Sequence, residues 1–191
     1  MTLQTATDTE SFAARYANGE PQLVWTELVA DLETPVSALL KLADDEQHSI
    51  LLESVEGGAV RGRYSILAFS PDLIWRCTGE SAEINRNART SPDMFEPMEG
   101  RSLDLLSALV DECRIEIPPE LPPMAAGLFG YFSYDAVRLM ERLPDDNPDS
   151  IDIPDSVFFR PTIIAVFDNV ADKVTLVTPV WADPAVDCDR A

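Results

Sequence analysis

Residues 49–69, SILLESVEGGAVRGRYSILAF, decide how the chain folds. An apolar run leads into Glu53 and Ser54, a Gly57-Gly58 turn follows, and a second strand-like run completes the stretch. This spacing predicts two strands joined by a loop. It also places Glu53 and Ser54 at the end of a buried strand, where a desolvated polar pair needs a partner. The pair is either structural, bonded to backbone or to an arginine, or half of a binding site.

Several stretches of the chain resemble the amino-terminal region of anthranilate synthase component I, a member of the chorismate-utilising enzymes. The stretches are 31–37 (DLETPVS), 51–56 (LLESVE), 63–65 (RYS), 71–75 (PDLIW), 127–131 (GLFGY) and 134–135 (YD). The likeness covers nearly the whole chain. It implies the large subunit of a lyase that converts chorismate to anthranilate in tryptophan biosynthesis.

In that family the Leu-Leu-Glu-Ser element contributes to the allosteric pocket for tryptophan, which is the feedback inhibitor. The resemblance therefore implies Glu53 and Ser54 as effector-binding residues, with Leu52, Arg63 and Tyr64 beside them. An amino-acid ligand needs an acceptor for its ammonium group, donors for its carboxylate and an apolar slot for its side chain. These residue types supply all three requirements.

Family members are much longer, and their chorismate site lies in the carboxy-terminal half. The motifs for the catalytic histidine and the magnesium-binding glutamates have no match here, so we expect no catalytic residue, metal site or cofactor in this portion. The resemblance implies Mg²⁺ in the full-length enzyme. It also implies two protein partners, a glutamine amidotransferase subunit (component II) and the carboxy-terminal domain of the same enzyme.

The resemblance predicts an amino-terminal regulatory domain over residues 1–181 and a linker-like tail over 182–191. Two alternatives stay open: a relative of aminodeoxychorismate synthase component I, and a stand-alone small-molecule-binding module. A fragment of this kind would leave apolar surface exposed, which allows a homodimer through the strands at 157–167 and 173–181.

The composition narrows the class of protein. The chain has 191 residues, 46% of them hydrophobic, and 14 basic against 34 acidic residues give a net charge of −20. This charge repels nucleic acids and anionic lipid surfaces. No apolar run reaches the roughly 18 residues of a membrane span, and the amino terminus lacks the features of a signal peptide. We therefore expect a cytoplasmic protein without nucleic-acid or membrane partners.

Strand-like runs follow one another directly at 64–86 and at 157–181, with no helix between them. A parallel βαβ order would require intervening helices. We therefore predict an α+β fold of mainly antiparallel sheet layers with helices packed on the outside. Thr34 and Pro35 form an N-cap and first-turn pair for one of those helices.

Two further features look functional but are better explained structurally. His48 is the chain's sole histidine, and a catalytic histidine needs a partnered nucleophile or an orienting group. The acidic segment 145–150 lacks the glycine and terminal glutamate of an EF-hand loop. We interpret both as surface features.

Overall fold

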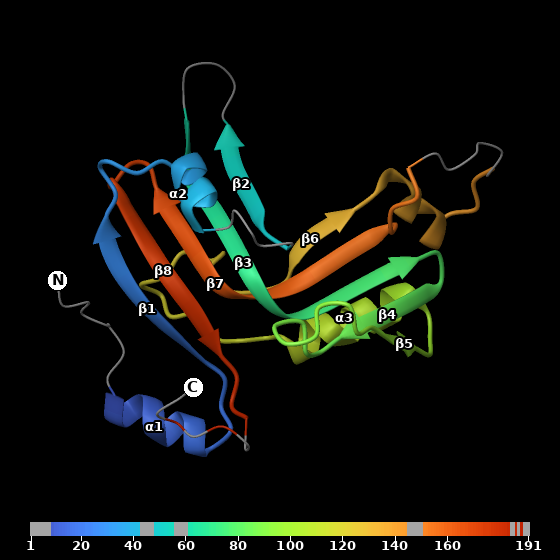
Figure 1. The fold of residues 1–191 in the computed structure, drawn as a ribbon, viewed down its shortest axis with the longest axis horizontal. Helices are drawn as coiled ribbons and strands as arrows, with labels where there is room; N and C mark the ends of the chain where they lie inside the picture. Colours follow the sequence, from blue (N-terminus) through green and yellow to red (C-terminus); the bar gives the residue numbers. More distant parts are fainter. Residues whose placement is uncertain are drawn as a thin grey trace. The chain divides into compact units, whose positions relative to one another are not determined.

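The computed structural model describes residues 9–42, 48–55, 61–144 and 151–183, together with residues 186 and 188. The chain forms two compact units (Figure 1). The first comprises Met1–Ser70, Ile115–Gly127 and Pro161–Ala191, and the second comprises Pro71–Arg114 and Leu128–Arg160. Two long strands, β3 (Arg61–Thr78) and β7 (Ser156–Asp168), contribute residues to both units.

The first unit is a sheet with antiparallel pairing. Besides its parts of β3 and β7, it contains α1 (Thr9–Ala17), β1 (Gln22–Val29), α2 (Pro35–Leu42), β2 (Ile50–Val55) and β8 (Lys173–Val180). The pairs β1–β8, β7–β8 and β2–β3 are all antiparallel, and β7 lies next to β3. The hairpin predicted from 157–167 and 173–181 is therefore confirmed as β7 and β8.

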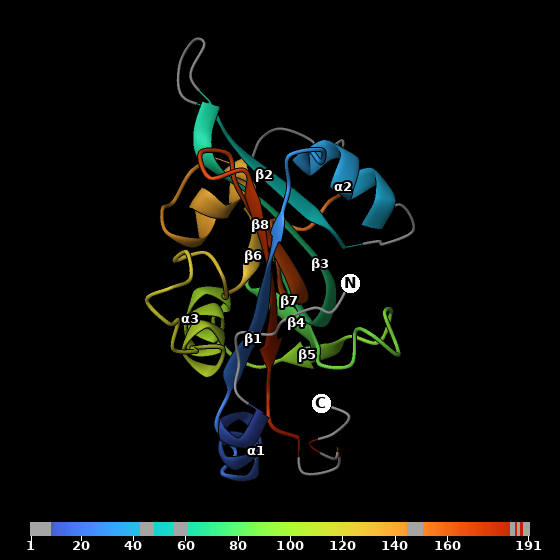
Figure 2. The ribbon, with the colours of Figure 1, turned by 90° about the vertical axis from the view of Figure 1, so that its left-hand side faces the viewer.

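Helix α2 covers one face of this sheet. Figure 2 views the strands nearly edge-on and shows α2 on one side of β2 and β3. The buried cluster between helix and sheet consists of Ala38, Leu67, Phe69, Ala165 and Phe167. The helix begins as the sequence predicts, because the Ser37 amide donates to Thr34 Oγ1 at 3.0 Å. Burial of the apolar side of α2 is the main force that holds it there.

The second unit is built on the remaining lengths of β3 and β7. Its other elements are β4 (Ser81–Asn85), β5 (Glu96–Met98), α3 (Ser102–Glu112), β6 (Phe129–Phe132) and the 3₁₀ helix η1 (Tyr134–Leu139). Strand β4 pairs antiparallel with β3 and β5, and β6 pairs antiparallel with β7. Trp75 is fully buried in this unit, with its ring centroid 6.4 Å from that of Phe158.

The predicted fold class, α+β with mainly antiparallel strands, is confirmed. The length of β3 differs from expectation: it is one strand of 18 residues, although Ser70 and Pro71 fall inside it. Ser70 has a φ of 54°, so the backbone is locally irregular just before Pro71, but the strand continues past it.

Some predictions fall on parts of the chain that the structure does not describe. The Gly57-Gly58 turn and the acidic segment 145–150 lie outside the described residues, as does most of the tail over 182–191. The assignment of 1–181 to one regulatory domain stays a prediction. Across the described ranges, no helix is both long enough and apolar enough to cross a membrane.

Candidate functional site

Strand β2 carries Leu52, Glu53 and Ser54, and its recorded partner among the described strands is β3. All three side chains are exposed. The prediction that Glu53 and Ser54 close a buried strand is therefore wrong. With one hydrogen-bonded neighbour, β2 lies at the edge of the sheet, where no second described strand covers its polar groups. The two side chains are available to a ligand instead.

The two faces of β2 differ in their surroundings. Leu51 packs against the cluster beneath α2 and pairs in register with Leu67 of β3. Because successive side chains of a strand point to opposite faces, Leu52 points away from that cluster and Glu53 returns to the α2 side. Glu53 lies opposite Ser65 in the register.

A β-bulge lies on β3, opposite Ser54. Glu53 pairs with Ser65 and Val55 pairs with Arg61, so the three β3 residues 62–64 stand against the single β2 residue Ser54. On β3, a Cβ atom built on Gly62 would collide with the side chain and carbonyl of Ser54. Glycine at this position therefore lets the bulged segment of β3 pass close to Ser54.

Arg63 has a partner in the protein that the sequence did not indicate. Its Nη2 lies 2.8 Å and its Nε 3.1 Å from Asp168 Oδ2, and its guanidinium lies 4.9 Å from the centre of the Tyr64 ring. The hydrogen bond from Arg63 lowers the pKa of Asp168 against the opposing effect of burial, and the amides of Val170 and Ala171 lower it further. The same bond raises the pKa of Arg63.

Arg63 and Tyr64 also line a hollow in the first unit. Its volume is about 360 Å³, near the lower end of the roughly 300–1,000 Å³ of small-molecule sites. Residues from β1, β7 and β8 and the proline-rich segment 119–123 complete the lining. The ion pair between Lys173 Nζ and Glu27, at 3.0 Å, borders it. The structure thus brings Arg63 and Tyr64 together, whereas Leu52, Glu53 and Ser54 do not line this hollow.

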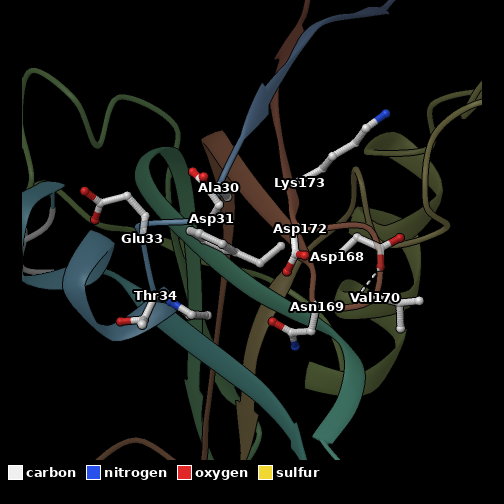
Figure 3. A pocket seen from close by; sticks show the side chains of 11 residues that line it. Ala30, Asp31, Glu33, Thr34, Asp168, Asn169, Val170, Asp172 and Lys173 are labelled. Atoms are coloured by element: carbon white, nitrogen blue, oxygen red, sulfur yellow. Dashed lines mark hydrogen bonds between the residues drawn. The ribbon is translucent and has the colours of Figure 1, made fainter.

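A second hollow, of about 240 Å³, lies at the turn between β7 and β8 and the start of α2 (Figure 3). Acidic side chains from both segments surround it, among them Asp31, Asp168 and Asp172. Glu33 is already bonded, because it accepts from Ser37 at 2.8 Å and pairs with Lys41. Within the described ranges, no three His, Cys, Asp or Glu side chains are placed to hold a metal ion.

The chain is similar to known proteins over almost its full length. It is 49% identical over 185 residues to anthranilate synthase component 1 of Cereibacter sphaeroides, which covers 97% of this chain and 37% of that relative. The chain belongs to the anthranilate synthase component 1 family. The Synechocystis protein of this name is 40% identical over 153 residues, covering 79% of this chain and 29% of the relative. The resemblance drawn from the sequence motifs is confirmed.

This member of the anthranilate synthase component 1 family spans about a third of the length of the curated relatives it matches. It corresponds to an amino-terminal region of them. A solved anthranilate synthase component I from Streptococcus pneumoniae is 24% identical, with a TM-score of 0.49 over 86% of this chain and 32% of that one. A scan against protein-family models found no match.

Two residues near the Glu53–Ser54 edge were not indicated by the family motifs. Asp168 ends β7 and Asn169 begins the turn after it, and both lie more than 100 positions from the β3 residues Arg63 and Gly62 that they contact. Their local signal, two turn-forming residues between strands, predicted the turn. It did not predict what the turn touches.

Proposed function

We propose that this chain is the amino-terminal, effector-binding part of the large subunit of anthranilate synthase, the enzyme that converts chorismate to anthranilate in tryptophan biosynthesis. The observation that carries the proposal is the 49% identity over 97% of the chain to a protein named anthranilate synthase component 1. The effector is L-tryptophan. It acts as the feedback inhibitor of the whole enzyme.

Glu53 and Ser54 are the centre of the proposed effector site. Both are exposed on an edge strand, so a ligand can reach them without unfolding a covered surface. The Glu53 carboxylate and the Ser54 hydroxyl suit the ammonium end of an amino acid. Leu52 supplies apolar surface at the same edge, with 44% of its area exposed.

Arg63 and Tyr64 form the second part of the proposed site. Two N–H groups of Arg63 donate to Asp168. A guanidinium has five N–H donors, so others remain for a ligand carboxylate. The Tyr64 ring lines the hollow of about 360 Å³ described above. We expect the isolated chain to bind tryptophan weakly, because the relatives contain about twice as much further sequence to complete the pocket.

The catalytic features of the enzyme belong to the part of the relatives' sequences that this chain does not cover. We place Mg²⁺, the catalytic residues and the contact with the glutamine amidotransferase subunit (component II) there. By itself the chain is expected to form no anthranilate, since magnesium-assisted elimination needs metal-binding carboxylates and a general acid or base in one site. A cytoplasmic location follows from the same proposal.

The test is the change Ser54→Ala in a full-length enzyme that carries this sequence. The tryptophan concentration for half inhibition should rise about tenfold to a hundredfold, which is the effect of losing one hydrogen bond to a charged group. Turnover of chorismate without tryptophan should be unchanged. Ser81→Ala serves as the matched control, because Ser81 is an exposed serine on a strand of the second unit. Unchanged inhibition in Ser54→Ala would remove this stretch from the effector site.

A further inference from the structure

Asn169, in the turn between β7 and β8, contacts β3 with both its side chain and its main chain. Its Nδ2 donates to the carbonyl oxygen of Gly62 at 3.0 Å and lies 3.5 Å from Ser65 Oγ. Its backbone amide donates to the carbonyl oxygen of Arg63 at 2.8 Å. Three contacts from one turn residue therefore hold three positions of β3, residues 62, 63 and 65.

The β3 positions that Asn169 contacts lie in or next to the bulge opposite Ser54. Ser65 lies opposite Glu53 in the register, and Gly62, within the bulge, is the residue against which Ser54 packs. The placement of Glu53 and Ser54 thus depends on the course of β3 between residues 62 and 65. Because β2 is an edge strand, no second described strand holds Glu53 and Ser54 in place if this part of β3 shifts.

Hydrogen bonds hold the turn between β7 and β8 in place, so the turn can fix the position of β3. Asp168 Oδ1 accepts from the amides of Val170 at 3.0 Å and Ala171 at 3.1 Å, which closes the turn on its own side chain. The Ala30 amide donates to the Asp172 carbonyl at 2.9 Å, which ties the turn to the segment after β1. Figure 3 shows this turn with Asp168, Asn169, Val170 and Asp172 labelled.

We propose that Asn169 is a positioning residue of the effector site, which sets the geometry of Glu53 and Ser54 through Gly62 and Ser65 of β3. The inference rests on the proposed function for its regulatory consequence. Asn169 acts through β3 and need not touch the ligand. Loss of its side-chain amide removes the donor to the Gly62 carbonyl, which loosens the bulge of β3 where Ser54 packs on it.

The experiment compares Asn169→Ala and Asn169→Gln with the parent in the full-length enzyme that carries this sequence. Amide hydrogen exchange of residues 50–55 reports the order of β2, and half inhibition by tryptophan reports the site. For Asn169→Ala we expect faster exchange over 50–55 and a half-inhibitory concentration raised about two- to tenfold, the effect of one neutral hydrogen bond. Uninhibited kcat and KM for chorismate should not move.

Asn169→Gln keeps an amide donor on a side chain one methylene longer, so both readouts should return toward the parent. Asn87→Ala is the control, because Asn87 is exposed and its recorded hydrogen bonds involve its main chain. Should Asn169→Ala not fold, Asn169→Asp takes its place, because aspartate keeps the shape of the side chain but lacks the amide donor, and the same shifts in exchange and inhibition are expected.

The outcomes separate this inference from the proposed function. If Ser54→Ala relieves inhibition while the Asn169 variants leave both exchange over 50–55 and inhibition unchanged, the positioning role is overturned and the effector site stands. If Ser54→Ala has no effect on inhibition, the effector site falls. Exchange over 50–55 in Asn169→Ala then still decides whether Asn169 orders β2.

Discussion

Arg160 binds both carboxylate oxygens of Asp72, with Nε 2.8 Å from Oδ1 and Nη2 2.7 Å from Oδ2. The pair lies within the second unit, and the two side chains are 15% and 26% exposed. Burial alone lowers the pKa of Arg160, but the hydrogen bonds and the charge of Asp72 outweigh it and raise the pKa. The guanidinium therefore stays charged and depends on its partner.

We expect Asp72→Asn to lower the free energy of unfolding by about 1.5–3 kcal/mol, the range for hydrogen bonds to charged groups, because it removes the carboxylate that pairs with a mostly buried guanidinium. Urea unfolding at neutral pH measures the effect. Glu83→Gln is the matched control: its pair with Arg76 has a similar separation, 2.8 Å against 2.7 Å, but the side chains are 41% and 43% exposed. That change should cost at most about 1 kcal/mol. Equal costs for the two variants would contradict the assignment.

Asp168→Asn should remove a pH-dependent part of the stability of the first unit. The folded-state pKa of Asp168 is lowered, first by the Arg63 hydrogen bond. Its stabilisation is therefore fully present above the ordinary aspartate pKa of about 3.9 and is lost as the pH falls through the lowered value. The asparagine keeps an oxygen for the Val170 and Ala171 amides. Urea midpoints of parent and variant between pH 7 and pH 2 should converge only at the acid end. A constant difference across that range would refute the role of the charge.

Gly130→Ala should destabilise the second unit by steric overlap. A Cβ atom on Gly130 would collide with the Val157 carbonyl and would lie 2.8 Å from Phe158 Cα, both backbone of β7. Backbone atoms cannot rotate away, so we expect a cost at the upper end of the about 1–3 kcal/mol of overpacked sites.

The comparison for Gly130→Ala is Gly79→Ala. At Gly79, with φ of 54°, an added Cβ meets open space, and only left-handed backbone strain of about 1–2 kcal/mol opposes the change. Thermal unfolding of both variants ranks them. A smaller loss of stability for Gly130→Ala than for Gly79→Ala would contradict the expected steric overlap at Gly130.

Cys77 and Cys113 should resist alkylation in the folded protein. They are 2% and 4% exposed, and burial is the first cause that raises the pKa of each thiol. Less thiolate and less access both slow the reaction. Labelling with iodoacetamide at pH 8, followed by mass spectrometry, should modify Cys188 first and the other two only after denaturation. Complete labelling of Cys113 under native conditions would show that the second unit opens readily.

Local signals in the sequence determined much of the fold. Thr34 and Pro35 specified the start of α2, because a cap hydroxyl and a proline act on the residues of one helical turn. The strands β7 and β8 were recognisable from their β-branched and apolar residues, with Asp168 and Asn169 as turn formers between them. Two glycines in the strand-like run 125–132 are typical of a close approach by another backbone or a ligand, and Gly130 meets the backbone of Val157 in that way. The family was recognisable from motifs spread along the chain.

The environment of the candidate site was decided by tertiary structure alone. The sequence placed Glu53 and Ser54 correctly on a strand but could not show that this strand lies at an edge, which depends on which strands pair. The resemblance implied Arg63 as an effector-binding residue but could not show that its guanidinium binds Asp168, 105 positions away. Ser102, the first residue of α3, is another such case, because its hydroxyl donates to the Gly79 carbonyl at 2.8 Å, 23 positions away. Helix caps and turns are made by residues a few positions apart, whereas the partner of a charged or hydroxyl side chain is set by strand register and packing, to which residues far apart contribute together.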